Sequence, residues 1–322
     1  MGDLVIDGKP LEKLLDVVSN AIGALCAPWQ TKRVARAEAE ADRIKAIESA
    51  KTEALLAENA ERYMALSSVE KRIVTKEVKR QNNIDNVVAI ASQSLEGEKE
   101  VSSERVNPDW ATRFFDIAQD ISDEAMQDLW GRILAGEVKR PQSYSLRTLE
   151  ALRNITREEA ELFEKAAQYV LYDGTYYLYR FSGNNEGPES IEYSEIARLV
   201  EIGLLQAGST VSQNYYNPDG VTSDAHLFYG GKYVAFIKIT PKIKQLSFPI
   251  YSLSKAGEEL YKLILVNPDV KYFEEVLRNI QQRNKSCSIK YAKYKWLDTS
   301  KEKFEYDDES ITEILPQSVA TS

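Results

Sequence analysis

The stretch from Trp29 to Glu96 contains neither Gly nor Pro, and this feature limits most strongly how the chain folds. Ala and Glu are its commonest residues, with Lys and Arg interspersed, a composition that favours helix. Helix rise is about 1.5 Å per residue, so an unbroken helix here spans on the order of 100 Å. Because the stretch is too polar to form a core, it predicts an exposed arm that meets copies of itself or another surface.

A shorter amphipathic helix is predicted ahead of the arm, at about residues 10–26, with Pro10 in its first turn. Its apolar side chains recur at four- and three-residue steps and form one stripe. The stripe consists of Leu11, Leu15, Val18, Ile22 and Leu25. We expect it to make assembly contacts with a partner helix. A membrane surface is the weaker alternative, because the polar face of this helix is not basic.

The arm itself is predicted to contain two helices, at about 30–66 and 68–95. The sequence Ser-Ser-Val-Glu at residues 67–70 is a capping box, which breaks the first helix and starts the second. Large apolar residues are sparse in the first helix, where Ile44 and Ile47 are further candidates for assembly contacts. The second helix carries a basic group that indicates a solvated face, with anionic lipid or nucleic acid as the alternative. That group is Lys71, Arg72, Lys76, Lys79 and Arg80.

A compact helical unit is predicted over residues 101–171, so the arm as a whole occupies residues 1–100. Residues able to cap helices recur through it at short intervals. The predicted N-caps are Asn107, Ser122, Ser145 and Thr156. The helix that follows Ser122 is expected to end at Gly136, with Trp130 and Leu134 in the core. This part of the chain is the one most clearly able to fold by itself.

Residues 172–284 are predicted to form an α+β module. Three runs rich in aromatic and β-branched residues predict strands. They are TYYLYRF (175–181), KYVAFIKI (232–239) and FPIYSLS (248–254). One helix is expected to end at Gly203, a C′ glycine, and another to begin at Ser254. The order helix, paired strands, helix is typical of a winged-helix-like module. The predicted fold class is therefore α+β, mainly α.

The last segment, residues 285–322, joins a basic, aromatic run to an acidic tail. The run consists of Lys290, Tyr291, Lys293, Tyr294, Lys295 and Trp296, interrupted by Ala292. Lysines contact phosphates while rings stack on bases, so the run is a candidate for binding nucleic acid. An edge strand that its lysines protect from aggregation explains the same pattern. The acidic tail either folds back on these lysines or stays disordered.

The chain offers few groups for catalysis. It has a single histidine, His226, and two cysteines, Cys26 and Cys287, which are far apart in the sequence. One histidine excludes zinc sites that need two or three, and no phosphate-binding glycine motif or nucleophile elbow occurs. We therefore expect no enzyme activity, no cofactor and no metal. His226 is predicted to lie at the start of a strand.

The block that begins at Asn107 carries a resemblance to a known family. Its landmarks are LWGRILAGE (129–137), SLRTLE (145–150) and EEAELF (158–163), followed later by VEIGLLQ (200–206) and YSLSKAGEEL (251–260). These segments resemble an uncharacterised bacterial family catalogued as domain of unknown function 2806, and more weakly the abortive-infection alpha proteins. The resemblance implies a bacterial source and, through the weaker relatives, a role in defence against phage. It implies no catalytic residue.

Together these patterns predict a non-enzymatic, self-associating interaction protein of a bacterial anti-phage response, assembling through its N-terminal helices. A nucleic-acid-binding regulator that uses the winged-helix-like module and the run from Lys290 to Trp296 is the alternative. The net charge of −9 counts against that alternative. The expected partners are copies of the chain and another defence or phage protein. We expect a cytoplasmic location, with attachment to the inner membrane as the alternative.

Overall fold

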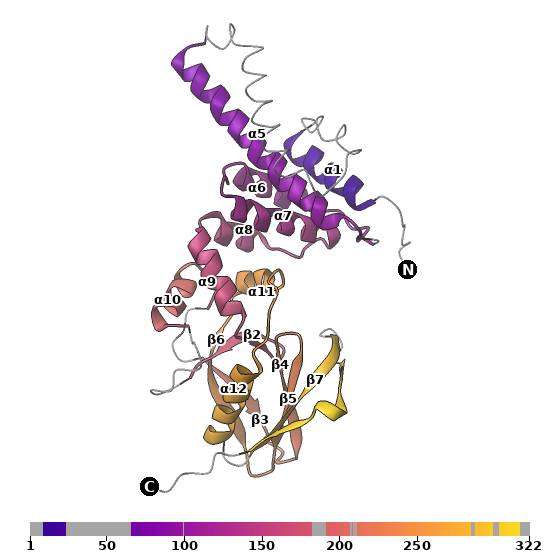
Figure 1. Cartoon of the computed structure of the whole chain (residues 1–322), viewed down its shortest axis with the longest axis vertical. Coiled ribbons are helices and arrows are strands. Elements are labelled where there is room, and N and C mark those ends of the chain that lie inside the picture. The colour runs from indigo at the N-terminus through magenta and orange to yellow at the C-terminus, as the bar shows by residue number, and fades with distance from the viewer. Residues whose placement is uncertain are drawn as a thin grey trace. The chain divides into compact units, whose positions relative to one another are not determined.

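The structure is a computed structural model that describes residues 9–23, 66–98, 100–181, 191–206, 208, 211–284, 287–298 and 303–315. Over these residues the chain is α+β and mainly α, as predicted (Figure 1). It divides into two compact units, Met1–Leu149 and Glu150–Ser322. The helix predicted at 30–66 lies outside the described residues except for Leu66, and Leu25, Ile44 and Ile47 lie outside them too.

Helices alone form the described part of the first unit. They are α1 (Lys9–Ile22), α5 (Ser68–Leu95), α6 (Pro108–Ala118) and α7 (Glu124–Lys139), while α8 (Leu146–Arg153) crosses into the second unit. The predicted restart of the arm is confirmed. The hydroxyl of Ser67 accepts from the Glu70 N–H at 3.3 Å, and the Glu70 carboxylate accepts from the Ser67 N–H at 2.8 Å. Asn107 is the N-cap of α6, also as predicted.

The predicted limits of α7 are wrong at both ends. Its N-cap is Asp123 and not Ser122, whose hydroxyl instead accepts from the Asn83 amide at 3.2 Å. The helix also continues through Gly136 to Lys139. A Cβ at Gly136 would lie 2.8 Å from the Tyr144 hydroxyl oxygen, so glycine is needed here to make room for a neighbour and does not end the helix.

Close packing of α5 on α7 holds the first unit together. A Cβ on Gly131 of α7 would lie 2.5 Å from the Ile90 side chain of α5, so this glycine allows the two helices to approach. Beneath them, the rings of Phe114 and Trp130 are 5.2 Å apart, and neither side chain is exposed. The predicted core position of Trp130 is confirmed.

Buried amides fix the position of α5 along this contact. The Gln127 amide of α7 donates to the Asn83 side chain at 3.1 Å and to the Ile121 carbonyl at 2.9 Å. The Asn83 amide donates to the Gln119 carbonyl at 2.8 Å. A shift of α5 by one turn would leave these polar groups buried without partners, at a cost of ~1–3 kcal/mol each.

Helix α1 packs on α6 and α7 within the same unit. Its buried face is formed by Leu14, Val17 and Val18. Of the predicted stripe only Val18 is buried, while Leu11, Leu15 and Ile22 are half-buried. Because apolar residues occur as neighbouring pairs in this helix, two adjacent faces have nearly equal hydrophobicity, and the spacing alone could not separate them.

After α8, the second unit contains four α-helices, one 3-10 helix and nine strands among the described residues. Its elements are α9 (Arg157–Ala167), β1 (Val170–Tyr172), β2 (Tyr176–Tyr179), α10 (Tyr193–Glu201), β3 (Ser212–Tyr216), β4 (Ser223–Tyr229), β5 (Tyr233–Ile239), β6 (Gln245–Ser252), α11 (Lys255–Tyr261), α12 (Val270–Arg283), β7 (Ser288–Asp298), β8 (Lys303–Tyr306), the 3-10 helix η1 (Asp308–Ser310) and β9 (Thr312–Ile314). Gly203 follows α10 with a φ of +78°, which confirms its predicted role as a C′ glycine.

The described strands join into one antiparallel sheet. The strand order is β3-β6-β2-β1-β4-β5-β7-β8, and β9 pairs with β7. The three strands predicted in residues 172–284 are present as β2, β5 and β6. The sheet is larger than the paired strands of a winged helix, because β7 pairs with β5 and so joins the predicted last segment, 285–322, to the same sheet. Such pairings between distant residues leave no local pattern in the sequence.

One face of the sheet packs against α12 (Figure 1). Phe273, Val276, Leu277 and Ile280 of this helix are fully buried there. Phe273 stacks on Tyr229 of β4, with ring centroids 5.2 Å apart. Side chains alternate between the faces of a strand, so the next residues of β4 and β5, such as Phe228 and Phe236, lie on the opposite face.

Glu137 in the LWGRILAGE segment generates the first prediction. Its carboxylate is buried and accepts backbone N–H groups from Gln142 at 2.7 Å, Ser143 at 3.0 Å and Tyr144 at 3.1 Å. Glu137→Ala should lower the free energy of unfolding by about 3 kcal/mol, because three buried donors lose a charged acceptor. Glu137→Gln, which keeps one acceptor oxygen, should cost less. Asp116→Ala, at an exposed position of α6, is the control in urea unfolding, and an equal effect would contradict the prediction.

Asp173, in the turn between β1 and β2, generates the second prediction. Its carboxylate accepts from the hydroxyls of Tyr215 and of fully buried Tyr177, the latter at 2.9 Å. Burial raises the Asp173 pKa above its ordinary value. The Asp173 carboxylate is therefore protonated at a higher pH in the folded chain than in the unfolded chain. As a result, its charge lowers the free energy of unfolding at neutral pH, and this loss disappears as the pH falls.

Asp173→Asn should consequently stabilise the chain most at pH 7, relative to the wild type, and less as the pH is lowered to about 4. Asp173→Ala should be destabilising at both values by ~1–3 kcal/mol, because it leaves the Tyr177 hydroxyl without its acceptor. Thermal unfolding at several pH values measures both effects. A constant difference between Asp173→Asn and wild type across the range would show that the carboxyl pKa is not raised.

Candidate functional site

The run predicted to contact nucleic acid lies on β7, in the interior of the sheet. This strand pairs with β5 on one side and with β8 and β9 on the other, so it is not an edge strand. Tyr291 is buried, and its hydroxyl donates to Glu274 of α12 at 2.6 Å. Lys290 and Lys293 are exposed but three positions apart, which places them on opposite faces of the strand. The structure thus does not gather the predicted lysines on one surface.

The acidic tail folds back on this strand. Glu305 of β8 accepts from the Lys295 ammonium at 3.0 Å and from the Trp296 indole N–H at 3.0 Å. The hydrogen bond to Glu305 raises the pKa of Lys295, and the bonds from Lys295 and Trp296 lower the pKa of Glu305. Lysine and tryptophan are therefore occupied by a group of the same chain, and of the two alternatives for the tail the first is confirmed.

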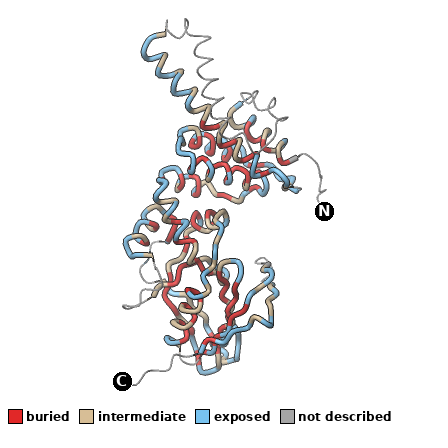
Figure 2. The backbone as a smooth tube through the Cα atoms, in the orientation of Figure 1, coloured by how far each residue is buried: buried red, intermediate tan, exposed pale blue. Residues whose placement is uncertain are grey.

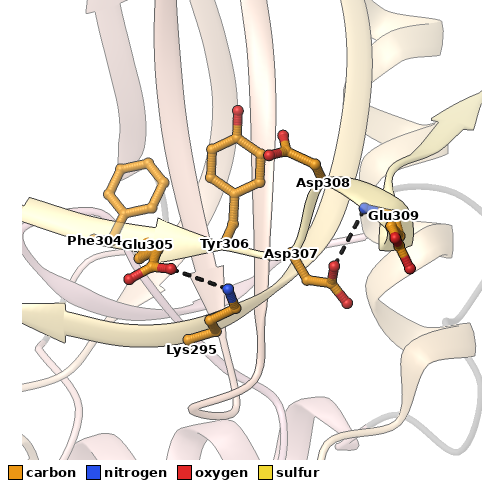
Figure 3. Close-up of a pocket in the computed structure, with 7 residues that line it drawn as sticks. All are labelled: Lys295, Phe304, Glu305, Tyr306, Asp307, Asp308 and Glu309. Atoms are coloured by element: carbon orange, nitrogen blue, oxygen red, sulfur yellow. Dashed lines mark hydrogen bonds and ion pairs between the residues drawn. The ribbon is translucent and has the colours of Figure 1, made fainter.

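An open hollow of about 450 Å³ lies beside this pair (Figure 3). It is lined by Lys295, Phe304, Glu305, Tyr306, Asp307, Asp308 and Glu309. Asp307 accepts the Glu309 N–H at 3.2 Å, as the second dashed line in Figure 3 shows. Four carboxylates face one ammonium group, so the hollow repels phosphate rather than attracting it.

Neither candidate for nucleophilic or base chemistry has a catalytic arrangement in the described ranges. His226 lies on β4, as predicted for a strand, with Phe236 and Phe304 edge-on at ring distances of 5.5 and 4.9 Å. Burial lowers its pKa, so the ring is neutral at pH 7. Burial also raises the pKa of the Cys287 thiol to about 11, which leaves it protonated and unreactive.

Metal and membrane features can be stated for the described ranges only. No cluster of three or more His, Cys, Asp or Glu side chains there is arranged to hold a metal ion. No helix in those ranges has the length and apolar character that a membrane crossing requires.

A groove of about 350 Å³ opens on the face of the sheet opposite α12. The strands β1, β2, β4 and β7 contribute to it, together with the turn at Gly230 and Gly231, Tyr261 at the end of α11 and the segment 262–266 that follows. We call it the aromatic groove. Its rings on this face are Tyr172, Tyr176, Phe228, Tyr261 and Tyr294; Tyr229 also borders it, with its ring stacked on Phe273 of α12.

Ring contacts hold the walls of the aromatic groove in place. Tyr176 lies 4.6 Å from Tyr172 and 5.1 Å from Tyr261, measured between ring centroids. Phe228 meets Tyr294 edge-on at 5.6 Å. Apart from Phe228 these four rings are only half-buried, so parts of their faces remain open to solvent. Such contacts add rigidity beyond the burial of area.

A second candidate surface is the amino-terminal half of α5. Figure 2 shows that its first turns are exposed, whereas its carboxy-terminal half is buried. Val69 and Ile73 are 54% and 53% exposed, although both are apolar. They are four positions apart and so lie on one face of the helix. We call this pair, together with the basic residues Lys71, Arg72, Lys76, Lys79 and Arg80, the α5 surface.

The basic residues of the α5 surface are partly engaged within the unit. Arg80 donates to Asp120 at 2.8 Å and to Glu77 at 3.2 Å. These hydrogen bonds raise the pKa of Arg80, and the bond from Arg80 lowers the pKa of Asp120. The basic group was predicted to be a solvated face, and Arg72, Lys76 and Lys79 are indeed exposed.

Sequence reasoning missed the aromatic groove. Tyr176 was recognised only as part of a strand, and Tyr261 only as part of a helix. The missing signal is long-range, because these residues meet through pairing of β1 with β2 and β4 and through the return of the chain after α11. The aromatic richness of residues 172–181 was the one local indication.

Comparison with known proteins gives one family. Residues 67–277 match the family described as Protein of unknown function (DUF2806). No curated protein and no solved structure matches the chain significantly. The match covers α5 through most of α12 and includes every segment on which the sequence resemblance rests. The chain therefore belongs to the DUF2806 family of proteins of unknown function.

Proposed function

We propose that this chain is a non-enzymatic interaction protein that associates with copies of itself through the α5 surface. The observation that carries the proposal is the exposure of Val69 and Ile73 on a helix that is otherwise firmly anchored. A paired apolar face on a fixed helix gains free energy when a partner covers it. In a symmetric dimer the same helix of the second copy supplies that cover.

The anchoring of α5 supports an assembly role for its free end. The carboxy-terminal half buries Val87, Val88, Ala91 and Leu95 and is fixed by the amides of Asn83 and Gln127. The amino-terminal half of α5 buries no comparable set of side chains, so its apolar residues are not needed for the core of the unit. A helix fixed at one end presents the other end without further loss of backbone entropy, which favours association.

Charge also bears on this contact. The α5 surface carries more basic than acidic residues, so two copies repel one another at low ionic strength. Salt screens that repulsion while leaving apolar contact intact. Association should therefore strengthen when salt is raised from low to moderate concentration. Binding of nucleic acid shows the opposite dependence, because salt weakens it.

The non-enzymatic part of the proposal is supported by the state of the two reactive side chains described above. His226 is neutral and packed between rings, and Cys287 is a buried thiol. A role in anti-phage defence, and a defence or phage protein as a further partner, rest on the weaker sequence resemblance alone. A cytoplasmic location accords with these roles.

The nucleic-acid alternative gains no support from the geometry. Lys295 is paired with Glu305, and the adjoining hollow is acidic. It stays a prediction with a direct test, in which loss of Lys290, Lys293 and Lys295 abolishes retention on DNA or RNA at low salt.

The assembly proposal predicts that Val69→Glu/Ile73→Glu will convert an oligomer to a single chain. Two apolar side chains that the partner would cover become charged, and burying these charges on association costs several kcal/mol in total. Light scattering after size-exclusion chromatography measures the mass. A chain beginning at Val101 is a poorer test, because it lacks α5 and exposes the face of α7 that α5 covers.

Val221→Glu is the matched control, since Val221 is 60% exposed and lies outside the α5 surface. It should leave the mass of the wild type unchanged. A wild-type chain that is monomeric at all salt concentrations would contradict the proposal. So would a double variant that keeps the wild-type mass.

A further inference from the structure

The aromatic groove combines features that the packing of the sheet does not require. It lies on the side of the sheet away from α12, and all of its walls come from the second unit. Its volume of about 350 Å³ falls within the range of small-molecule sites in proteins. A surface left over from imperfect packing would not be expected to collect so many rings in one place.

The walls suit a flat ring. Tyr172 and Tyr176 are tilted against one another at 42°, and Tyr176 against Tyr261 at 49°, so the three rings turn their faces in different directions around one space. Aromatic rings, including those of nucleobases, stack on or meet the edge of such faces. In the turn between β4 and β5, a Cβ on Gly231 would lie 4.0 Å from the Tyr294 hydroxyl, so this glycine leaves that side of the groove free of a side chain.

The polar groups of the groove are donors. The hydroxyls of Tyr176, Tyr261 and Tyr294 make no hydrogen bond to any described residue. Burial raises the pKa of all three; neighbouring phenols raise the pKa of Tyr176 and Tyr261 further, and the Glu258 carboxylate adds to the rise at Tyr176. These hydroxyls therefore stay protonated at neutral pH, and each can donate to an oxygen of a ligand.

A cation stands at the rim. Lys262 follows α11 directly, is exposed, and forms no ion pair with a described residue. No carboxylate is among the residues that line the groove. Three neutral donors and one ammonium group, with no acid among the lining residues, are complementary to an anion.

We propose that the aromatic groove binds a small anion that carries a flat ring, of the class of nucleoside monophosphates. The ring lies among Tyr172, Tyr176 and Tyr261, and the phosphate accepts from Lys262 and from the phenol hydroxyls. This site is separate from the α5 surface and does not depend on assembly. It also differs from the run on β7, of which only Tyr294 takes part.

Calorimetric titration of the full chain tests the site with each of the four common ribonucleoside monophosphates as probes. Adenosine supplies the ring without the anion, and inorganic phosphate supplies the anion without the ring. At least one monophosphate should bind with a dissociation constant of about 1 mM or lower. Adenosine and inorganic phosphate should each bind at least about tenfold more weakly, because each lacks half of the contacts. No heat from any monophosphate would overturn the proposal.

Two variants locate the binding. Lys262→Met keeps the aliphatic stem and should weaken the monophosphate at least about fivefold while leaving adenosine unchanged. Tyr261→Phe/Tyr294→Phe keeps both rings and should also weaken the monophosphate, because two donors are lost. The matched controls are Lys242→Met and Tyr216→Phe, both exposed and outside the groove.

The controls should bind as the wild type does. Equal affinity in Lys262→Met and in Lys242→Met would place binding elsewhere and overturn the assignment. Repeating the titration with Val69→Glu/Ile73→Glu separates the two proposals. Unchanged affinity in that variant shows that the groove acts without assembly, and loss of affinity there would contradict the independence of the site.

Discussion

A sheet with apolar side chains on both faces must be covered twice, and this requirement shapes the second unit. One face is closed by α12, whose Phe273 and Leu277 are fully buried. No helix of that length in the described part of the chain covers the other face. It is covered in part by β8, whose Phe304 lies 5.1 Å from Phe228, and in part by the chain after α11. The aromatic groove lies on this face beside the chain after α11, which forms one of its walls.

Much of the helical unit could be predicted from the sequence, because its information is local. Caps act within three or four residues, so Ser67, Asn107 and Thr156 were identified correctly. The errors at Ser122 and Gly136 have a different origin. Both residues serve neighbours distant in the sequence, Asn83 and Tyr144 respectively, and such contacts override the local preference.

The sheet and its sites were much less predictable. Tyr177 and Tyr291 are buried while Tyr176 and Tyr294 face the groove, yet all four occur in aromatic runs with similar composition. Which face a residue occupies depends on register, and register depends on pairing between distant strands. The run on β7 was correctly recognised as unusual. Its interaction with Glu305 could be stated only as an alternative, because charge alone does not fix where a tail folds.

The continuity of α5 has a mechanical consequence. Residues 68–95 form one uninterrupted helix, so its two ends cannot rotate or slide independently. Val69 and Ile73 lie on the same continuous helix as Asn83, which is hydrogen-bonded to Gln127 of α7. The buried amides resist gradual displacement, since a small slip breaks several of them together. The helix therefore ties its exposed first turns rigidly to its buried contact with α7.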